Sequence, residues 1–438
     1  MMKMKLPLPV APPRKQNKQQ VGLNLNKKLD AASKAFRAAL AKNDYELAYK
    51  EILIAYKLMP SHPNILMDMA YTELRLGRYE KSFNRYLKAI EASPGKVDTN
   101  IYDGLAEVAH FLKDDENLAK YGGLAIETKK QQVAQQPLVA QINTPAPTFN
   151  PNNPQENIIA YSLFGGLPRY CETSIINIDL AKEIYPEWIC RFYVDESVPQ
   201  SIRDRLKEKG AQVVMVSEEQ KKLSGLFWRF FVMDDPTVNC FLVRDADSLV
   251  SYRERAAVDE WLQSKKWFHC MHDFYSHTEL ILAGMWGGFN GVFKNIEQHI
   301  ENYIKTGNYL NQRVMDQHYL RFCIWPTVQQ SVLLHDSQGF DPASLPFPAY
   351  QKQTDFEDLS EFHVGMNEGS SQVYADVTQP NAKYVEWTLT NEANVEVCRY
   401  EADVLKDHKI LVELPRTYAR KLESKEWKLH TYLAEKGD

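Results

Sequence analysis

Hydrophobic residues follow two different spacings along this chain. From Leu29 to about Lys130 they recur three and four residues apart, which predicts amphipathic helices. Beyond residue 156, short apolar runs alternate with helical stretches, and the runs Asn157–Phe164, Ile189–Val194 and Val238–Val243 are predicted strands. This alternation predicts an α/β fold with a mostly parallel sheet that is covered by helices on both faces.

The helical part of the chain contains a repeat. Pro60 and Pro94 end successive units at the 34-residue period of tetratricopeptide repeats. A third unit, around Gly104–Thr128, fits with a slip of two or three residues. Each unit would be a helical hairpin that buries its apolar face only against its neighbours, and a generic helical bundle is the alternative. Other positions also align at this period: Tyr45 with Tyr79, Ala55 with Ala89, and Asn43 with Gly77.

Local composition divides the chain further. The first residues are rich in Pro, Lys and Gln, which predicts disorder, and a second stretch rich in Pro, Gln and Asn predicts an extended linker. Within the α/β part, Gly225–Met233 and Gln312–Cys323 are predicted helices, the second ending before Pro326. We therefore predict a disordered leader at 1–24, tetratricopeptide-like repeats at 25–130, a linker at 131–156, the α/β domain at 157–375 and an extension of unknown role at 376–438.

Composition narrows the classes of function. The chain has 438 residues, 44% of them hydrophobic, and a formal net charge of −5, so nucleic-acid binding by the whole molecule is not expected. No apolar stretch is long enough for a transmembrane segment. The six cysteines are scattered and form no C-x-x-C pair, which is typical of reduced thiols packed in a core. We expect a cytoplasmic protein, either free or peripheral at the inner membrane.

The most informative motif follows the third of these predicted strands. The run Val238–Val243 ends in Arg244-Asp245-Ala246-Asp247-Ser248, and Ser251-Tyr252-Arg253-Glu254 is a capping box that predicts a helix start. The two aspartates therefore lie at the carboxyl end of a strand, where open α/β sheets bind their ligands. Such a pair can hold a divalent cation that bridges a diphosphate, although an Asp-x-Asp sequence alone is more often a solvated turn.

Several segments together extend this hypothesis. They are Tyr161–Gly165 with Pro168–Tyr170, Phe192–Asp195, Trp228–Phe230, Arg244–Ser248 with Arg253-Glu254, Met271–Asp273, Gly284–Gly287 and Asp316–Leu320. Over about residues 156–375 the sequence resembles nucleotide-sugar glycosyltransferases of the GT-A fold, and in particular bacterial Asp-x-Asp enzymes, some of which are fused to helical repeats. The resemblance implies a Rossmann-like GT-A catalytic domain, here preceded by all-α tetratricopeptide-like repeats, and metal-dependent transfer of a sugar.

The resemblance also implies a metal site and a donor site. Asp245 and Asp247 would hold Mn²⁺, or Mg²⁺, and His335 would be the third ligand, which would favour Mn²⁺ because its donor is an imidazole. Without the resemblance, His335 is an ordinary histidine at a strand end. The nucleotide sugar would contact Ser162, Leu163, Arg169, Arg229 and Asp245, because Gly165-Gly166 permits close backbone approach and arginines pair with diphosphate.

Two further carboxylates are candidates for the chemistry. Asp273 or Asp316 would deprotonate the acceptor hydroxyl in an inverting enzyme, or orient the donor in a retaining one. The candidate acceptor residues are Trp286, Gly287 and Gln317. Trp286 between glycines suits a platform for a sugar ring, or else it is a buried indole in a tight turn.

The expected partners follow from this reaction. We expect a nucleotide sugar as the donor, with UDP-sugars favoured. The acceptor would be a glycan or a protein, in the synthesis of a bacterial surface glycan or glycoprotein. We also expect a protein partner on the repeats.

Other functions remain open from the sequence. A scaffold would carry its function on the repeats and an inactive GT-A-like domain. A zinc metallohydrolase would use His269, His272 and His277 with Asp273. A nucleotidyltransferase would need a Gly-rich loop with a basic residue, where this chain has only Gly165-Gly166.

Overall fold

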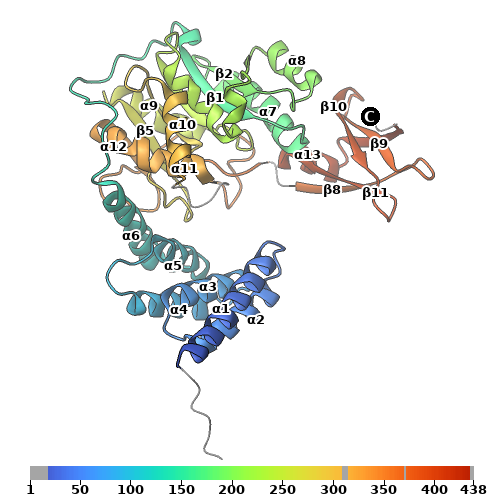
Figure 1. The fold of residues 1–438 in the computed structure, drawn as a ribbon. Helices are drawn as coiled ribbons and strands as arrows, with labels where there is room; N and C mark the ends of the chain where they lie inside the picture. The colour runs from blue at the N-terminus through green and yellow to red at the C-terminus, as the bar shows by residue number, and fades with distance from the viewer. Residues whose placement is uncertain (1–17, 308–313, 369–370, 435–438) are drawn as a thin grey trace, which may run out of the picture. The chain divides into compact units, whose positions relative to one another are not determined.

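The chain folds into two compact units that divide between Ala125 and Ile126. The computed structural model describes residues 18–307, 314–368 and 371–434. From the blue to the red end of the chain, Figure 1 shows helices, then a sheet with its covering helices, then a group of strands. None of the described helices is long and apolar enough to cross a membrane.

The predicted leader differs from the structure in its last residues. The first helix begins at Lys18, inside the segment 1–24 that was expected to be disordered. No proline lies between Pro13 and Pro60, so none interrupts this helix. Residues 1–17 lie outside the described residues.

The predicted helical repeat is confirmed. The three positions Asn43, Gly77 and Lys113 all have a left-handed backbone, and each lies in the turn between two helices. The first two are 34 residues apart (77 − 43) and the last two 36 (113 − 77), which is the slip expected in the third unit. The helices are α1 (Lys18–Leu40), α2 (Tyr45–Leu58), α3 (Pro63–Arg75), α4 (Tyr79–Ala92), α5 (Thr99–Leu112) and α6 (Asp115–Val133).

Small residues allow these helices to pack closely. Helix α1 packs on α2, α3 on α4, and α4 on α5. The aligned residues Ala55 and Ala89 are both buried. A Cβ at Gly104 of α5 would collide with the ring of Tyr86 on α4, so a glycine is required where these helices meet.

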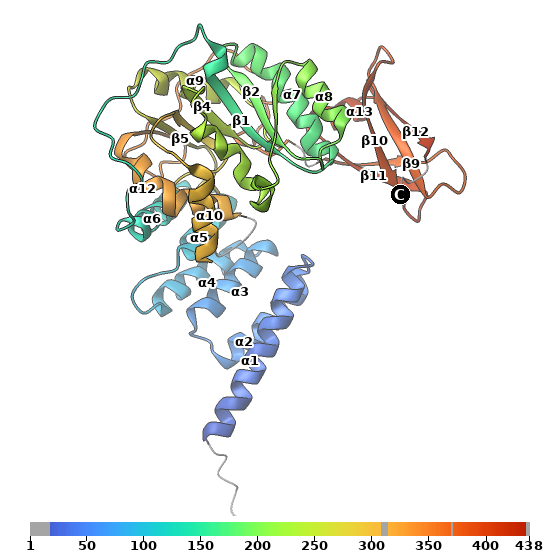
Figure 2. The same ribbon diagram turned by 45° about the horizontal axis from the view of Figure 1, so that its top comes forward.

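The second unit contains a seven-stranded sheet of the predicted, mostly parallel kind. Its order is β3-β2-β1-β4-β6-β5-β7, and Figure 2 shows β2, β1 and β4 side by side. Only β6 among these strands runs antiparallel to its neighbours β4 and β5. The strands are β1 (Asn157–Leu163), β2 (Ile189–Val194), β3 (Gln212–Met215), β4 (Cys240–Arg244), β5 (Phe268–His272), β6 (Met285–Phe289) and β7 (Val332–Asp336).

Both faces of this sheet are covered, as predicted. On one face Ile175, Ile202 and Trp261 belong to a core with alternate residues of β1, β2 and β4. On the other, Phe230 packs against Trp286 and Tyr319. The first face carries α7 (Pro168–Ile184), α8 (Gln200–Glu208) and α9 (Tyr252–Gln263), and the second carries η3 (Gly225–Asp234), α10 (Ile296–Thr306) and α11 (Met315–Tyr319).

Two predicted helices differ in type from the structure. The segment Gly225–Asp234 is a 3₁₀-helix. After α11 the chain makes a π-helical turn, Leu320–Ile324, and continues into α12 (Trp325–Val328). Pro326 therefore lies in the first turn of α12, where its missing N–H removes no helical hydrogen bond. Residues Gln312–Arg313 of the predicted helix lie outside the described residues.

The segment predicted as a linker, 131–156, lies within the second unit and is held against the sheet domain. The indole N–H of Trp267 donates to the carbonyl of Thr144 at 2.7 Å. Phe149 stacks on Trp188 with ring centroids 5.3 Å apart. These contacts fix a proline-rich chain that would otherwise be extended and free.

The C-terminal strands begin before the predicted boundary at residue 376. They form a three-stranded sheet, β10-β9-β12, and a two-stranded sheet, β11-β8, around a core that includes Trp387 and Leu414. We call this part the C-terminal lobe. Its elements are β8 (Ser371–Asp376), β9 (Tyr384–Thr390), β10 (Glu396–Asp403), β11 (Lys409–Leu414), α13 (Arg416–Glu423) and β12 (Lys428–Leu433).

A buried carboxylate attaches this lobe to the sheet domain. Glu172 of α7 is fully buried and forms a two-fold ion pair with Arg205 of α8, at 2.7 and 2.9 Å. It also accepts hydrogen bonds from the hydroxyls of Tyr400 (2.6 Å) and Tyr418 (3.3 Å). Because a buried charge needs such partners, the lobe and the sheet domain depend on each other here.

Candidate active site

A small cavity of about 220 Å³ lies at the carboxyl edge of the sheet. Three elements enclose it: the end of β1 with the start of α7, the helix η3, and the turn that follows β4. The predicted donor residues Ser162, Leu163, Arg229 and Asp245 all line it, together with Asp247. The other lining residues are Phe164, Tyr170, Leu226 and Ala246.

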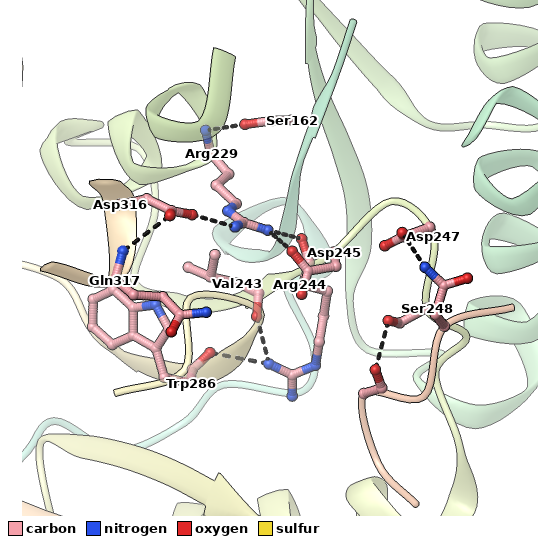
Figure 3. A network of polar contacts seen from close by, with 12 residues as sticks. Ser162, Arg229, Val243, Arg244, Asp245, Asp247, Ser248, Trp286, Asp316 and Gln317 are labelled. Carbon is pink, nitrogen blue, oxygen red and sulfur yellow. Dashed lines mark hydrogen bonds and ion pairs between the residues drawn. The ribbon is translucent and has the colours of Figure 1, made fainter. Parts of the chain in front are cut away.

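The Asp-x-Asp turn is held by buried polar contacts. Arg244, the last residue of β4, forms an ion pair of 3.1 Å with Glu254 and donates to the carbonyls of Val243 and Trp286, as Figure 3 shows for the two carbonyls. The hydroxyl of Ser251 accepts from the backbone N–H of Glu254, so the predicted helix cap is confirmed. The Glu254 carboxylate pairs with Arg244 and accepts from the Tyr185 hydroxyl. The capping segment thereby fixes the strand end that precedes the aspartates.

Arg229 is the centre of charge in this site. Its guanidinium lies between Asp245, with which it forms an ion pair, and Asp316, at 2.9 Å (Figure 3). Its backbone N–H donates to the hydroxyl of Ser162 at 2.9 Å. The Arg229 side chain is only 5% exposed, and the two carboxylates raise its pKa against the opposing effect of burial. Arg229 therefore stays charged and fixes the position of Asp245.

A glycine makes room for the first aspartate. A Cβ at Gly284 would collide with the carboxylate of Asp245 and lie 3.0 Å from its backbone nitrogen. The loop before β6 thus comes so close to Asp245 that no side chain fits between them. This is the physical reason for the glycine in the predicted Gly284–Gly287 segment.

Asp247 is set up differently from Asp245. One of its carboxylate oxygens accepts from the amide nitrogen of Asn367 at 2.5 Å, and Arg169 lies 3.8 Å away. Burial, and next the neighbouring charge of Asp245, raise the pKa of Asp247 to about 6. Two negatively charged carboxylates that repel each other attract a cation, because the cation relieves the repulsion. The guanidinium of Arg169 also contacts Glu413 of the C-terminal lobe, at 3.4 Å.

The structure does not place the predicted third metal ligand, His335, among the residues that line the cavity. Its ring is buried, with Nδ1 2.8 Å from Nε2 of His269 and Nε2 2.9 Å from the carboxylate of Glu260. Both ring nitrogens therefore have partners in the sheet. Among the described residues, no group of three His, Cys, Asp or Glu side chains could hold a metal ion.

The three histidines of the zinc alternative each have a different hydrogen-bond partner. His269 is paired with His335. His272 is hydrogen-bonded to the carbonyl of Glu279 at 2.7 Å, and His277 accepts from the backbone N–H of Asp273 at 2.9 Å. These histidines are buried hydrogen-bonding groups, and burial lowers the pKa of each.

The two predicted catalytic carboxylates do not line the cavity. Asp273 forms a two-fold ion pair with Arg253, at 2.7 and 2.8 Å, and accepts from the backbone N–H of Val364. Asp316 pairs with Arg229 and accepts from the backbone N–H of Gln317 at 3.0 Å. Both are buried, so the geometry gives them the role of positioning other residues rather than of exposed bases.

The predicted acceptor platform is a core residue. Trp286 lies within β6, is fully buried, and packs edge-on against Phe230 and Phe241. A Cβ at Gly287 would lie 2.6 Å from the carbonyl oxygen of Phe241, so this glycine allows β4 and β6 to pair. Gln317 is half-buried on α11, and its backbone N–H donates to Asp316.

Asn367 was not among the residues predicted for the site. It lies 120 residues after Asp247 in a segment without apolar periodicity, and the sole local signal is Gly365, which has a left-handed backbone. Such a signal marks a turn and says nothing about a ligand.

The comparisons with known proteins find only distant likenesses. No protein-family model and no curated protein matches the sequence. Similar solved structures include the TPR2B domain–pHsp70 complex of yeast Sti1 (18% identity, 24% of this chain and 82% of that chain, TM-score 0.23). A second is a mutant O-GlcNAc transferase of Thermobaculum terrenum (11% identity, 45% of this chain and 43% of that chain, TM-score 0.23). A third is 4-diphosphocytidyl-2C-methyl-D-erythritol synthase from Anaerococcus prevotii (13% identity, 41% of this chain and 86% of that chain, TM-score 0.27). At these TM-scores, none of the three assigns a fold or a function to the chain.

Proposed function

We propose that this chain is a metal-dependent glycosyltransferase of the GT-A type, which transfers a sugar from a nucleotide-sugar donor. One observation carries the proposal: two carboxylates at a strand end, Asp245 and Asp247, share a cavity with the buried guanidinium of Arg229. Acidic residues that bind a cation, next to a fixed arginine, provide what a nucleoside diphosphate needs as a leaving group.

The residues of the cavity have separate tasks in this reaction. Asp245 and Asp247 would hold Mn²⁺ or Mg²⁺, which would neutralise the charge that develops on the departing diphosphate. Arg229 keeps Asp245 in place, and Asp316 keeps Arg229 in place. Arg169, at the start of α7, faces Asp247 and would pair with a phosphate oxygen.

The wall of the cavity suits a nucleoside. Ser162 and Leu163 come from β1, and Phe164 and Leu226 add apolar surface. Phe164 is 44% exposed and packs edge-on against Trp228, so the exposed part of its ring could contact a base or a ribose. UDP-sugars remain the favoured donors.

The acceptor is proposed from the repeats. Stacked helical hairpins present an extended surface that suits a peptide or a partner protein. We therefore propose a protein or a protein-associated glycan as the acceptor, in the synthesis of a bacterial surface glycan or glycoprotein.

The test is nucleotide release from a panel of UDP-, GDP-, CMP- and dTDP-sugars with Mn²⁺, with and without EDTA. We expect slow hydrolysis of one donor, which EDTA and Asp247→Asn abolish and the half-exposed control Asp259→Asn does not change. No release from any donor, with no metal-dependent stabilisation by any nucleotide, would favour a scaffold. Pyrophosphate release from a nucleoside triphosphate and a sugar phosphate would instead identify a nucleotidyltransferase.

A further inference from the structure

The segment Val364–Glu368 is fastened beside the Asp-x-Asp turn from several sides. The N–H of Val364 donates to Asp273 at 2.9 Å. The Ser248 hydroxyl donates to the carbonyl of Gly365 at 3.0 Å, and the N–H of Glu368 donates to the backbone carbonyl of Asp247 at 2.6 Å. Asn367 and Ser248 are also paired as in an antiparallel sheet. The backbone of Asn367 is therefore fixed directly beside Asp247.

The side chain of Asn367 has one satisfied end and one unsatisfied end. Its amide nitrogen donates to Asp247 at 2.5 Å. Its amide oxygen is buried and has no hydrogen-bond partner among the described residues. A buried acceptor without a partner costs about 1–3 kcal/mol. Rotation about the Cβ–Cγ bond exchanges the two ends of the amide and turns this oxygen toward the Asp247 carboxylate.

We propose that Asn367 is the third protein ligand of the cation that Asp245 and Asp247 hold. This inference rests on the proposed function and replaces His335 with a residue that contacts the aspartate pair. Amide oxygens bind hard divalent cations as carboxylates do. After the rotation of the amide, a bound cation pairs with its oxygen, and the cation removes the repulsion between the two aspartates.

The proposal changes the expected metal preference. With His335 the site would contain an imidazole, which favours Mn²⁺ over Mg²⁺. With Asn367 all three protein ligands are oxygens, a set that suits Mg²⁺ as well as Mn²⁺. Mg²⁺ should therefore also bind at this site, at a higher concentration than Mn²⁺.

The C-terminal lobe would help to position this metal ligand. The carboxylate of Glu368 accepts from the N–H and the hydroxyl of Thr417, at 2.7 and 2.6 Å. The N–H of Arg416 donates to the carbonyl of Glu368 at 2.8 Å. The first turn of α13 thus holds the residue next to Asn367, so the lobe supports the metal ligand.

The test measures Mn²⁺ binding to the full chain without nucleotide, by the loss of the free Mn²⁺ electron paramagnetic resonance signal. We expect Asn367→Ala to weaken binding at least about tenfold, since even outer-shell changes cost that much. Asn367→Asp, which keeps an oxygen ligand, should bind within about threefold of the native chain or more tightly. The matched control is Gln372→Ala, which removes an exposed amide five residues further along.

Each other result overturns a defined part of the proposal. If Asp247→Ala abolishes binding and Asn367→Ala leaves it unchanged, the inference fails and the proposed function stands. If the native chain binds no more Mn²⁺ than Asp247→Ala, the metal-dependent function itself fails. If Asn367→Ala and Asn367→Asp weaken binding equally and lower the melting temperature equally, Asn367 is structural and no ligand.

Discussion

Arg229 and Asp316 form an ion pair of 2.9 Å in which each side chain is 5% exposed. The pair links η3 to α11 and orients the guanidinium toward Asp245. Because both charges are removed from water, neither residue tolerates the loss of the other.

The first prediction concerns this pair. Arg229→Gln leaves Asp316 as an unpaired buried charge, so the free energy of unfolding should fall by about 3–5 kcal/mol. In the double variant with Asp316→Asn the loss should be smaller than the sum of the single losses by at least about 1 kcal/mol. Urea denaturation of the four proteins measures both quantities. Additive losses would show that the two residues act independently.

The second prediction concerns the glycine beside Asp245. Gly284→Ala should displace the Asp245 carboxylate and weaken Mn²⁺ binding at least about tenfold, with a small change in melting temperature. Gly166→Ala is the matched control at the same edge of the sheet, because the nearest atoms to its Cβ would be Pro199 carbons and the Ser197 carbonyl, at 3.3 Å or more. Equal Mn²⁺ affinity in Gly284→Ala and the native chain would contradict the close approach.

The third prediction is a pH dependence of metal binding. The pKa of Asp247 is about 6, and a cation binds its deprotonated form. Mn²⁺ affinity should therefore fall about tenfold for each pH unit below 6 and level off above about 7. Titration calorimetry between pH 5 and pH 8 checks this. A flat profile across that range would show that Asp247 is no ligand.

The fourth prediction follows from the same group by linkage. The folded-state pKa of Asp247 is raised above its ordinary value of 3.8, so the folded chain binds this proton more tightly than the unfolded chain. The stabilisation is fully present below about pH 3.8 and is lost as the pH rises through about 6. Asp247→Asn should therefore stabilise the metal-free protein at pH 8 by up to about 3 kcal/mol. Chemical denaturation with EDTA present measures it, and a destabilised variant would contradict it.

The fifth prediction separates the core from the site. Trp286→Phe should lower the free energy of unfolding by about 1–3 kcal/mol and leave Mn²⁺ affinity within about twofold. Phe164→Leu, at a half-exposed aromatic on the cavity wall, should do the reverse: stability changes little and the donor KM rises. A raised KM for an acceptor in Trp286→Phe alone would restore the platform interpretation.

The sheet was predictable because its strands carry their own signals. The strands β1, β2 and β4 are apolar runs that end in turns, and Ser251 and Glu254 mark the following helix in the sequence itself. The strand β6 was missed because Gly284–Gly288 contains three glycines, which disfavour a strand by propensity. Pairing with β4 and β5 on both sides forces that segment to be extended.

The site was predictable only where its residues are close to a strand end. Asp245 and Asp247 follow β4 directly, so the edge they occupy could be inferred. The burial of His335 and Trp286 could not be predicted because the sequence does not show which side of a strand faces a neighbouring core. Asn367 contacts Asp247, but the two are 120 residues apart in the sequence. No local sequence pattern predicts a contact between residues that are so far apart in the chain.

The partners of Glu172 limit which parts of the chain evolution can remove or exchange. Its carboxylate takes partners from α8 and from two elements of the C-terminal lobe. A deletion or recombination between residues 376 and 384 would leave a charge in the interior with half of its partners gone. The last sixty or so residues therefore cannot be removed without a loss of stability. A protein in which they are replaced would need a compensating change in α7.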